Sequence, residues 1–124
     1  MVEIKISELS IGDWVRYRDR DWMVCSLYQF TEEVGLWRKD SQLCEYVADI
    51  EPIPLTPEIL EKNGICKTYE SDEYAVYKGE GFNVTEYYTE LWEFEKHRNR
   101  LMLRNVHQLQ HALRLAGVGK EIEI

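Results

Sequence analysis

The sequence is poor in cysteine, and its three cysteines, Cys25, Cys44 and Cys66, lie far apart. No two of them have the close spacing of a thiolate metal site, and an odd number cannot complete a disulfide framework. We therefore expect no metal held by thiolates and three buried free thiols in a reducing compartment.

Long apolar runs are also missing. No stretch approaches the roughly 20 apolar residues that a membrane-spanning helix needs. The first six residues, Met1 to Ile6, alternate between charged and apolar side chains, and they lack the apolar core of a signal peptide. These absences predict a cytoplasmic protein with no membrane partner.

Basic residues are fewer than acidic ones, 15 against 23, which gives a formal net charge of −8. Residues 1–62 carry 13 acidic and 7 basic side chains (−6), and residues 63–124 carry 10 and 8 (−2). Binding to nucleic acid usually needs a basic patch, because neutralised phosphates supply much of the affinity. We therefore expect nucleic acid to be an unlikely partner.

The common catalytic motifs are absent as well. The chain contains no GxSxG, GxxxxGK[ST] or GxGxxG sequence, and residues 79–81 (Gly-Glu-Gly) lack the following helix that phosphate binding uses. Three pairs of carboxylates could resemble a catalytic pair, but their neighbours are charged or polar, so we expect them to be solvated surface residues. They are Glu32/Glu33, Asp72/Glu73 and Glu93/Glu95. The sequence predicts a protein that is not an enzyme and that has no catalytic residue and no cofactor.

What the chain does have is core-forming material and a strand pattern in its first half. Apolar residues make up 44%, with four Trp and eight Tyr. Alternation predicts strands at 14–18, 22–28, 33–38 and 43–48, with a reversal at 19–21. Pro52 and Pro54 keep residues 50–55 extended. Five short extended segments predict a small SH3-like β-barrel unit over residues 1–55.

Residues 56–124 predict an α+β unit that packs with the first as one compact body. Thr56 and Pro57 begin a short helix, and Asn63-Gly64 ends it. An antiparallel β-meander follows at 74–77, 82–88, 91–96 and 100–104. Asn105 and Gln108 form a capping box for a last helix, whose apolar stripe is Val106, Leu109, Leu113 and Ala116. The tail at 121–124 alternates like a short edge strand.

Three stretches together carry a family resemblance. They are LSIGDWV at residues 9–15, EPIPLTPEILEKNG at 51–64 and VHQLQHALRL at 106–115. In this order they resemble a family of small uncharacterised proteins of Bacteroidetes-type bacteria, many encoded in phage-like or mobile regions. Asp13 stands where relatives tend to carry Asn. The resemblance implies no activity and no functional residues.

His107 and His111 are spaced four residues apart on the last helix, so they could share a metal. A third ligand would have to come from elsewhere, for instance His97 or a carboxylate, and no Glu lies between the two histidines. A polar helix face is the more common role of such a pair, so we predict no metal site.

One basic and aromatic cluster is a candidate interaction surface: Trp14, Arg16, Arg18 and Trp22. The cluster is interrupted by Asp13, Asp19 and Asp21. Local ion pairs between these aspartates and the arginines are therefore the simpler explanation of the cluster. Trp, Tyr and Arg dominate binding hot spots. We therefore predict a non-catalytic protein–protein interaction or accessory module of phage or mobile-element biology. The alternatives are nucleic-acid binding by the barrel surface and an acidic mimic of nucleic acid.

Overall fold

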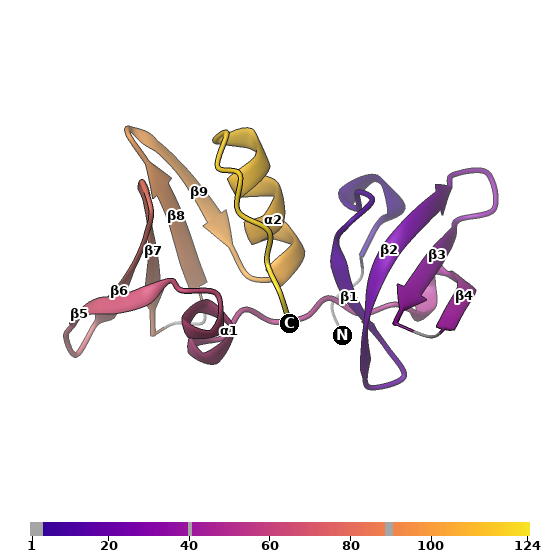
Figure 1. Cartoon of the computed structure of the whole chain (residues 1–124), viewed down its shortest axis with the longest axis horizontal. Helices are drawn as coiled ribbons and strands as arrows, with labels where there is room; N and C mark the ends of the chain where they lie inside the picture. The colour runs from indigo at the N-terminus through magenta and orange to yellow at the C-terminus, as the bar shows by residue number, and fades with distance from the viewer. Residues whose placement is uncertain (1–3, 40, 89–90) are drawn as a thin grey trace. The chain divides into compact units, whose positions relative to one another are not determined.

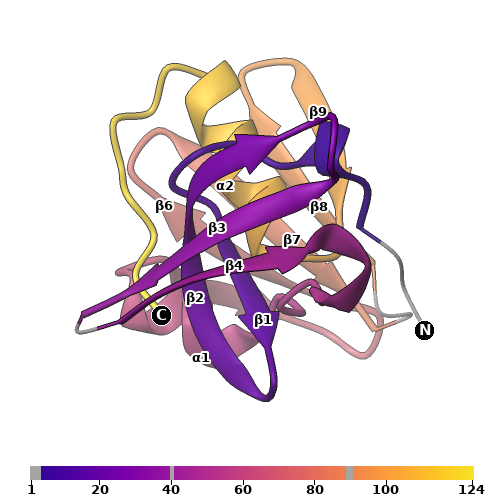
Figure 2. The same cartoon turned by 90° about the vertical axis from the view of Figure 1, so that its right-hand side faces the viewer.

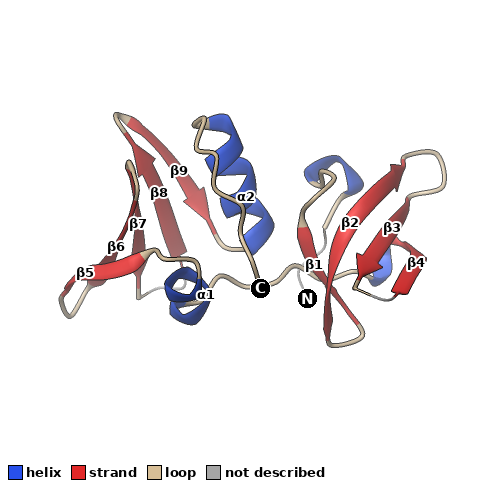
Figure 3. Cartoon of the chain, viewed as in Figure 1, coloured by secondary structure: helices blue, strands red, loops and turns tan. Residues whose placement is uncertain are grey.

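The computed structural model describes residues 4–39, 41–88 and 91–124. It confirms the predicted α+β class, with two antiparallel sheets and two α-helices in the described part of the chain. The chain divides into two compact units, Met1–Ile53 and Pro54–Ile124, and each is described by itself. Figure 1 labels the strands in chain order, and Figure 3 shows both α-helices in the second unit.

The first unit is built on a four-stranded sheet. Its strands, in both chain order and sheet order, are β1 (Trp14–Tyr17), β2 (Arg20–Tyr28), β3 (Glu33–Arg38) and β4 (Ser41–Tyr46). Figure 2 shows the four strands together, with β4 at one edge. Two short 3₁₀ turns flank the sheet, η1 (Ile6–Glu8) and η2 (Val47–Asp49). All four strands expected from alternation are present, with ends shifted by up to two residues.

The segment at 50–55, expected to be extended, forms a single bridge beside β1 rather than a strand. The Arg16 N–H donates to the Glu51 carbonyl at 2.8 Å, and the Glu51 N–H donates back at 2.8 Å. The first sheet is therefore an open four-stranded sheet with one added bridge.

The reversal between β1 and β2 lies one residue earlier than predicted. Arg18 and Asp19 form the turn, with φ values of 50° and 62°. Two successive positive φ angles match the type I′ hairpin turn, whose twist suits the two strands beside it. Arg20 therefore already pairs with Tyr17, and this turn sets the register of the whole hairpin.

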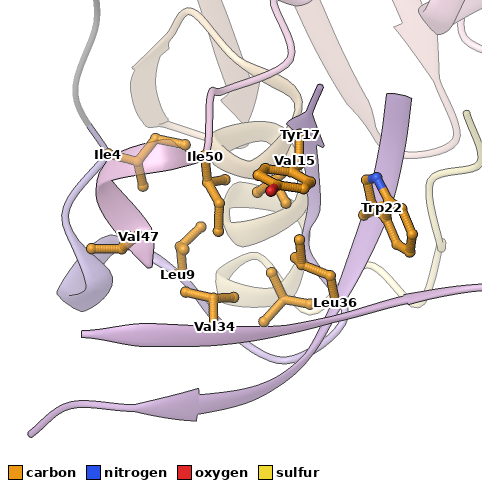
Figure 4. Close-up of a cluster of buried hydrophobic side chains, with 10 residues drawn as sticks. Ile4, Leu9, Val15, Tyr17, Trp22, Val34, Leu36, Val47 and Ile50 are labelled. Atoms are coloured by element: carbon orange, nitrogen blue, oxygen red, sulfur yellow. The ribbon is translucent and has the colours of Figure 1, made fainter. Parts of the chain in front are cut away.

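Alternate residues of the first sheet form its core (Figure 4). Val15, Val24, Val34 and Leu36 have no exposed surface, and neighbours at alternate positions point the other way. Isoleucine and leucine side chains from outside the strands close the cluster, namely Ile4, Leu9 and Ile50.

The second unit begins with α1 (Pro57–Lys62), as predicted. The Thr56 hydroxyl accepts the Ile59 N–H at 3.3 Å, and Pro57 occupies the first turn. The helix ends at Asn63, and Gly64 takes the left-handed conformation with φ 75°.

A five-stranded antiparallel sheet follows, with its strands again in chain order. The strands are β5 (Cys66–Glu70), β6 (Tyr74–Gly79), β7 (Phe82–Tyr87), β8 (Leu91–Lys96) and β9 (Asn99–Leu103). Four of them match the predicted meander. β5 was not predicted, because each of its residues is exposed and no apolar alternation marks it.

The last helix, α2 (Val106–Leu115), lies against the five-stranded sheet (Figure 1). The predicted capping box is present: the Gln108 side chain accepts the Asn105 N–H at 3.1 Å. Val106, Leu109 and Leu113 are buried, as the stripe predicted, whereas Ala116 is only partly buried and caps the helix. One face of the sheet supplies the opposing core, which includes Tyr77, Val84 and Phe94.

The tail forms no strand at 121–124, which corrects the prediction. The Asn63 side chain holds it instead. The Asn63 amide donates to the Glu123 carbonyl at 2.8 Å, and its carbonyl oxygen accepts the Glu123 N–H at 2.7 Å. The residue before Glu123, Ile122, is buried. A side chain therefore supplies the two hydrogen bonds that a neighbouring strand would have supplied.

We predict that Leu109→Ala lowers the free energy of unfolding by about 2–5 kcal/mol, because it removes a fully buried side chain. Leu115→Ala is the matched control on the same helix, where the side chain is 81% exposed. Chemical denaturation of both variants and the parent is the measurement. Equal midpoints for the two variants would contradict the packing of α2.

Candidate functional site

The predicted interaction surface divides between the two faces of the first sheet. Trp14 pairs with Met23 and Arg16 pairs with Asp21, on the face opposite the core. Trp22 pairs with Val15, so its side chain lies on the core face, where it is only 6% exposed (Figure 4). Trp22 therefore does not belong to the exposed surface. The Arg18-Asp19 turn sets the register of the hairpin, and this register places Trp22 opposite Val15 on the core face.

The arginines of that prediction have local partners. The Arg16 Nε lies 3.4 Å from a carboxylate oxygen of Asp21, which is the kind of local ion pair that the sequence indicated. The Arg18 guanidinium lies over the Tyr17 ring, 5.3 Å from its centroid. Both cations are thus engaged by side chains of their own hairpin.

A larger group of exposed aromatic residues lies further along the same sheet. The outer face of β3 continues the row from Trp14 and Met23 to Trp37, which is 40% exposed. A second row joins Tyr28, Glu33 and Tyr46 across three strands. We call the following four residues the outer aromatic surface: Tyr28, Phe30, Trp37 and Tyr46.

Sequence reasoning missed this surface, although the sequence carried a signal for it. Val34 and Leu36 are buried, so period-two alternation places Trp37 on the opposite face. Tyr28 and Tyr46 are 51% and 58% exposed, and Phe30 is fully exposed in the turn after β2. Large side chains at this exposure supply apolar area that a monomeric fold does not use.

A hollow of about 350 Å³ opens within this surface. Tyr28 and Phe30 line one part of it, and Glu33 and Cys44 line another. Apolar atoms dominate its lining, with a carboxylate at one side. An aromatic hollow with one acid suits an apolar side chain of a partner rather than a chemical reaction.

Cys44 is exposed, as are Cys25 and Cys66, which corrects the expectation of buried thiols. Cys25 follows the buried Val24, so alternation along β2 places its side chain on the outer face. The Cys44 Sγ donates to the Glu33 carboxylate at 3.4 Å. Desolvation raises the pKa of the Cys44 thiol, and the contact with Glu33 raises it further.

We predict that Cys44 reacts with Ellman's reagent more slowly than the other two thiols near pH 8, because less of it is thiolate. Glu33→Gln should speed the reaction of Cys44 with the reagent, because it removes the carboxylate that raises the pKa of the thiol. Mass spectrometry of the partly labelled protein identifies the sites. Cys44 labelling first, or no change in Glu33→Gln, would contradict the assigned contact.

The second unit contains a partly buried carboxyl group, Glu86, on the face of β7 that also carries Phe82 and Val84. Burial raises the pKa of Glu86 and outweighs Lys67, which lowers it. Burial also raises the pKa of Tyr77 to about 12, and the Tyr77 hydroxyl interacts with the Glu86 carboxylate. Both groups favour their protonated forms, so the pair is a pH-dependent part of the core.

We predict that Glu86→Gln raises the melting temperature more near pH 8 than near pH 4. A carboxyl group whose pKa is raised in the fold binds its proton more tightly there than in the unfolded chain. Its ionisation therefore costs stability as the pH rises through the raised pKa, and Gln removes that cost. Thermal unfolding at both pH values is the measurement. An equal effect at both would contradict the raised pKa.

The paired histidines of α2 lie edge to face, with ring centroids 5.8 Å apart. His107 is buried and His111 is partly buried. Within residues 4–39, 41–88 and 91–124, no group of three or more His, Cys, Asp or Glu side chains is placed to hold a metal ion.

The outer face of the second sheet carries a tyrosine cluster. The Tyr69 and Tyr74 ring centroids lie 5.4 Å apart, and those of Tyr74 and Tyr87 lie 6.1 Å apart. The proximity of Tyr69, followed by desolvation, raises the pKa of Tyr74. These rings pack on one another, which leaves less free apolar area than the rings around the hollow of the first unit offer.

Comparison with family models, curated proteins and solved structures gives no match. Neither α-helix in the described part of the chain has the length and apolar character that crossing a bilayer requires.

Proposed function

We propose that this chain is a non-catalytic protein-binding module and that the outer aromatic surface is its binding site. One observation carries the proposal: four large aromatic side chains are exposed on the outer side of the first sheet and the turn after β2, and two of them, Tyr28 and Phe30, line an apolar hollow. Binding hot spots are enriched in Trp and Tyr that fill or line such hollows. Burying these side chains against a partner removes apolar area from water, which is favourable.

The neighbouring chemistry supports a protein partner more than a nucleic acid. The arginines beside Trp14 are engaged by Asp21 and Tyr17, and a carboxylate, Glu33, borders the hollow. A phosphate backbone near that carboxylate would be repelled. Nucleic-acid binding and an acidic mimic have no observation of their own in their favour.

We also propose that the first unit is an SH3-like small barrel. Three features support this finer assignment. The sheet order is consecutive, a 3₁₀ turn follows β4, and the chain then returns to pair Glu51 with Arg16 of β1. That return brings the end of the unit beside its first strand, which is the step that curls a meander toward a barrel.

The remaining predictions from the sequence stay proposals of the same kind. They are the family resemblance, a role in phage or mobile-element biology and a place in the cytoplasm. The resemblance is the support for the biological setting.

We predict that Phe30→Ala and Tyr46→Ala each weaken capture of the partner about tenfold or more, a loss typical of hot-spot truncation. The measurement is affinity purification from the native host with quantitative mass spectrometry. Both residues are exposed, so the fold should be unaffected. Tyr69→Ala, on the second sheet and 51% exposed, is the matched control. Equal capture by all three variants and the parent would refute the proposed surface.

A further inference from the structure

The two sheets have four edge strands, and three of these edges are closed or protected. β1 is covered by the bridge between Arg16 and Glu51. β5 has a register shift after Lys67, and such bulges and lysines discourage a further strand. β9 carries the charged Arg100, which discourages a further strand, and just past its end the Leu55 N–H bonds to the Arg104 carbonyl at 3.0 Å, next to the bridge of Pro54 with Asn105.

β4 lacks these protections. Its sequence, Ser-Gln-Leu-Cys-Glu-Tyr, contains no Lys, Arg or Pro. It pairs with β3 through six consecutive residues without a register shift, and five of its six residues are exposed. Among the residues that the structure describes, no strand pairs with its other side. A regular open edge offers unpaired N–H and C=O groups to an extended chain.

The charges around β4 are arranged along its length. Its C-terminal end has carboxylates on and beside it, from Glu33, Glu45 and Asp49. Glu32 belongs to the same end, because its carbonyl accepts the Val47 N–H at 2.7 Å. The hairpin end instead carries Arg38 and Lys39. An extended partner therefore meets negative charge at the C-terminal end of β4.

The hollow beside β4 would receive side chains of such a partner. Cys44, in the middle of β4, lines the hollow with Tyr28 and Phe30. Successive side chains of a strand point to opposite faces, so every second residue of an added strand faces this side of the sheet. Apolar side chains at those positions complement the aromatic rings.

We propose that β4 binds an extended segment of a partner protein as an added antiparallel strand, with basic residues in the segment's N-terminal half and apolar residues at alternate positions. Antiparallel pairing is the more stable arrangement, and it brings the N-terminal half beside the carboxylates. This proposal rests on the proposed function and specifies the partner of the same surface.

The probe is a fluorescein-labelled octapeptide, Lys-Val-Lys-Val-Thr-Val-Ser-Val, titrated with the full chain by fluorescence anisotropy. We expect binding to weaken about tenfold or more when alternate backbone amides are N-methylated, because the charge stays and the hydrogen bonds are lost. Moving the two lysines to the C-terminal half should also weaken binding. Equal binding of all three peptides would overturn strand addition.

The charge component is tested with the double variant Glu33→Gln and Glu45→Gln. Gln is nearly isosteric with Glu, so the fold should be retained. We expect weaker binding of the octapeptide and a smaller dependence on salt. Glu93→Gln, on β8 of the other sheet, is the matched control and should bind like the parent. Unchanged binding by the double variant would overturn the charge complementarity.

Amide hydrogen exchange locates the pairing. Saturation with the octapeptide should protect amides within residues 41–46 and leave those within 66–70, the edge strand β5, unchanged. No protection at 41–46 at millimolar peptide overturns strand addition. The same amides could instead be protected without peptide, in a protein that sedimentation shows to be a dimer. That result would also overturn the proposal, because the occupant of β4 would then be a second copy of the chain. Partner capture that depends on Phe30 would still support the outer aromatic surface in either case.

Discussion

The fold depends on burying one face of each antiparallel sheet. In the first unit Val15, Val24, Val34 and Leu36 are fully buried, and this constraint sends the alternate side chains outward. The outward positions hold Trp37, Tyr28 and Tyr46, which are too large and apolar to be ordinary solvent-facing residues. The same alternation that makes the core therefore also makes the candidate binding surface.

Most elements could be predicted from the sequence because their signals are local. Alternation is a property of each strand alone, and Thr56-Pro57 and Asn105 with Gln108 mark helix starts within a few residues. β5 escaped prediction because no apolar residue alternation distinguishes an exposed edge strand from a loop. The strand predicted for the tail is wrong, because the tail is held by hydrogen bonds to Asn63, which lies 60 residues earlier in the sequence.

The site was harder to predict than the fold, because a surface is made by register. The sequence shows that Trp14 and Trp22 are near each other, but only the turn at Arg18-Asp19 decides that they face opposite ways. Tyr28 likewise reaches the outer face only because β2 has a register shift after Val24. Trp37 and Tyr46 lie on different strands, and they share one face of the sheet only through the register in which β3 pairs with β4.

The hydrogen bonds between Asn63 and Glu123 have a consequence for the order in which the chain is made. A ribosome releases the residues of the first unit, up to Ile53, well before the second unit is complete. The second unit cannot form its Asn63 contacts until residue 123 has been synthesised and has left the exit tunnel. During translation the first sheet can therefore form while Asn63, at the end of α1, still lacks its partner Glu123.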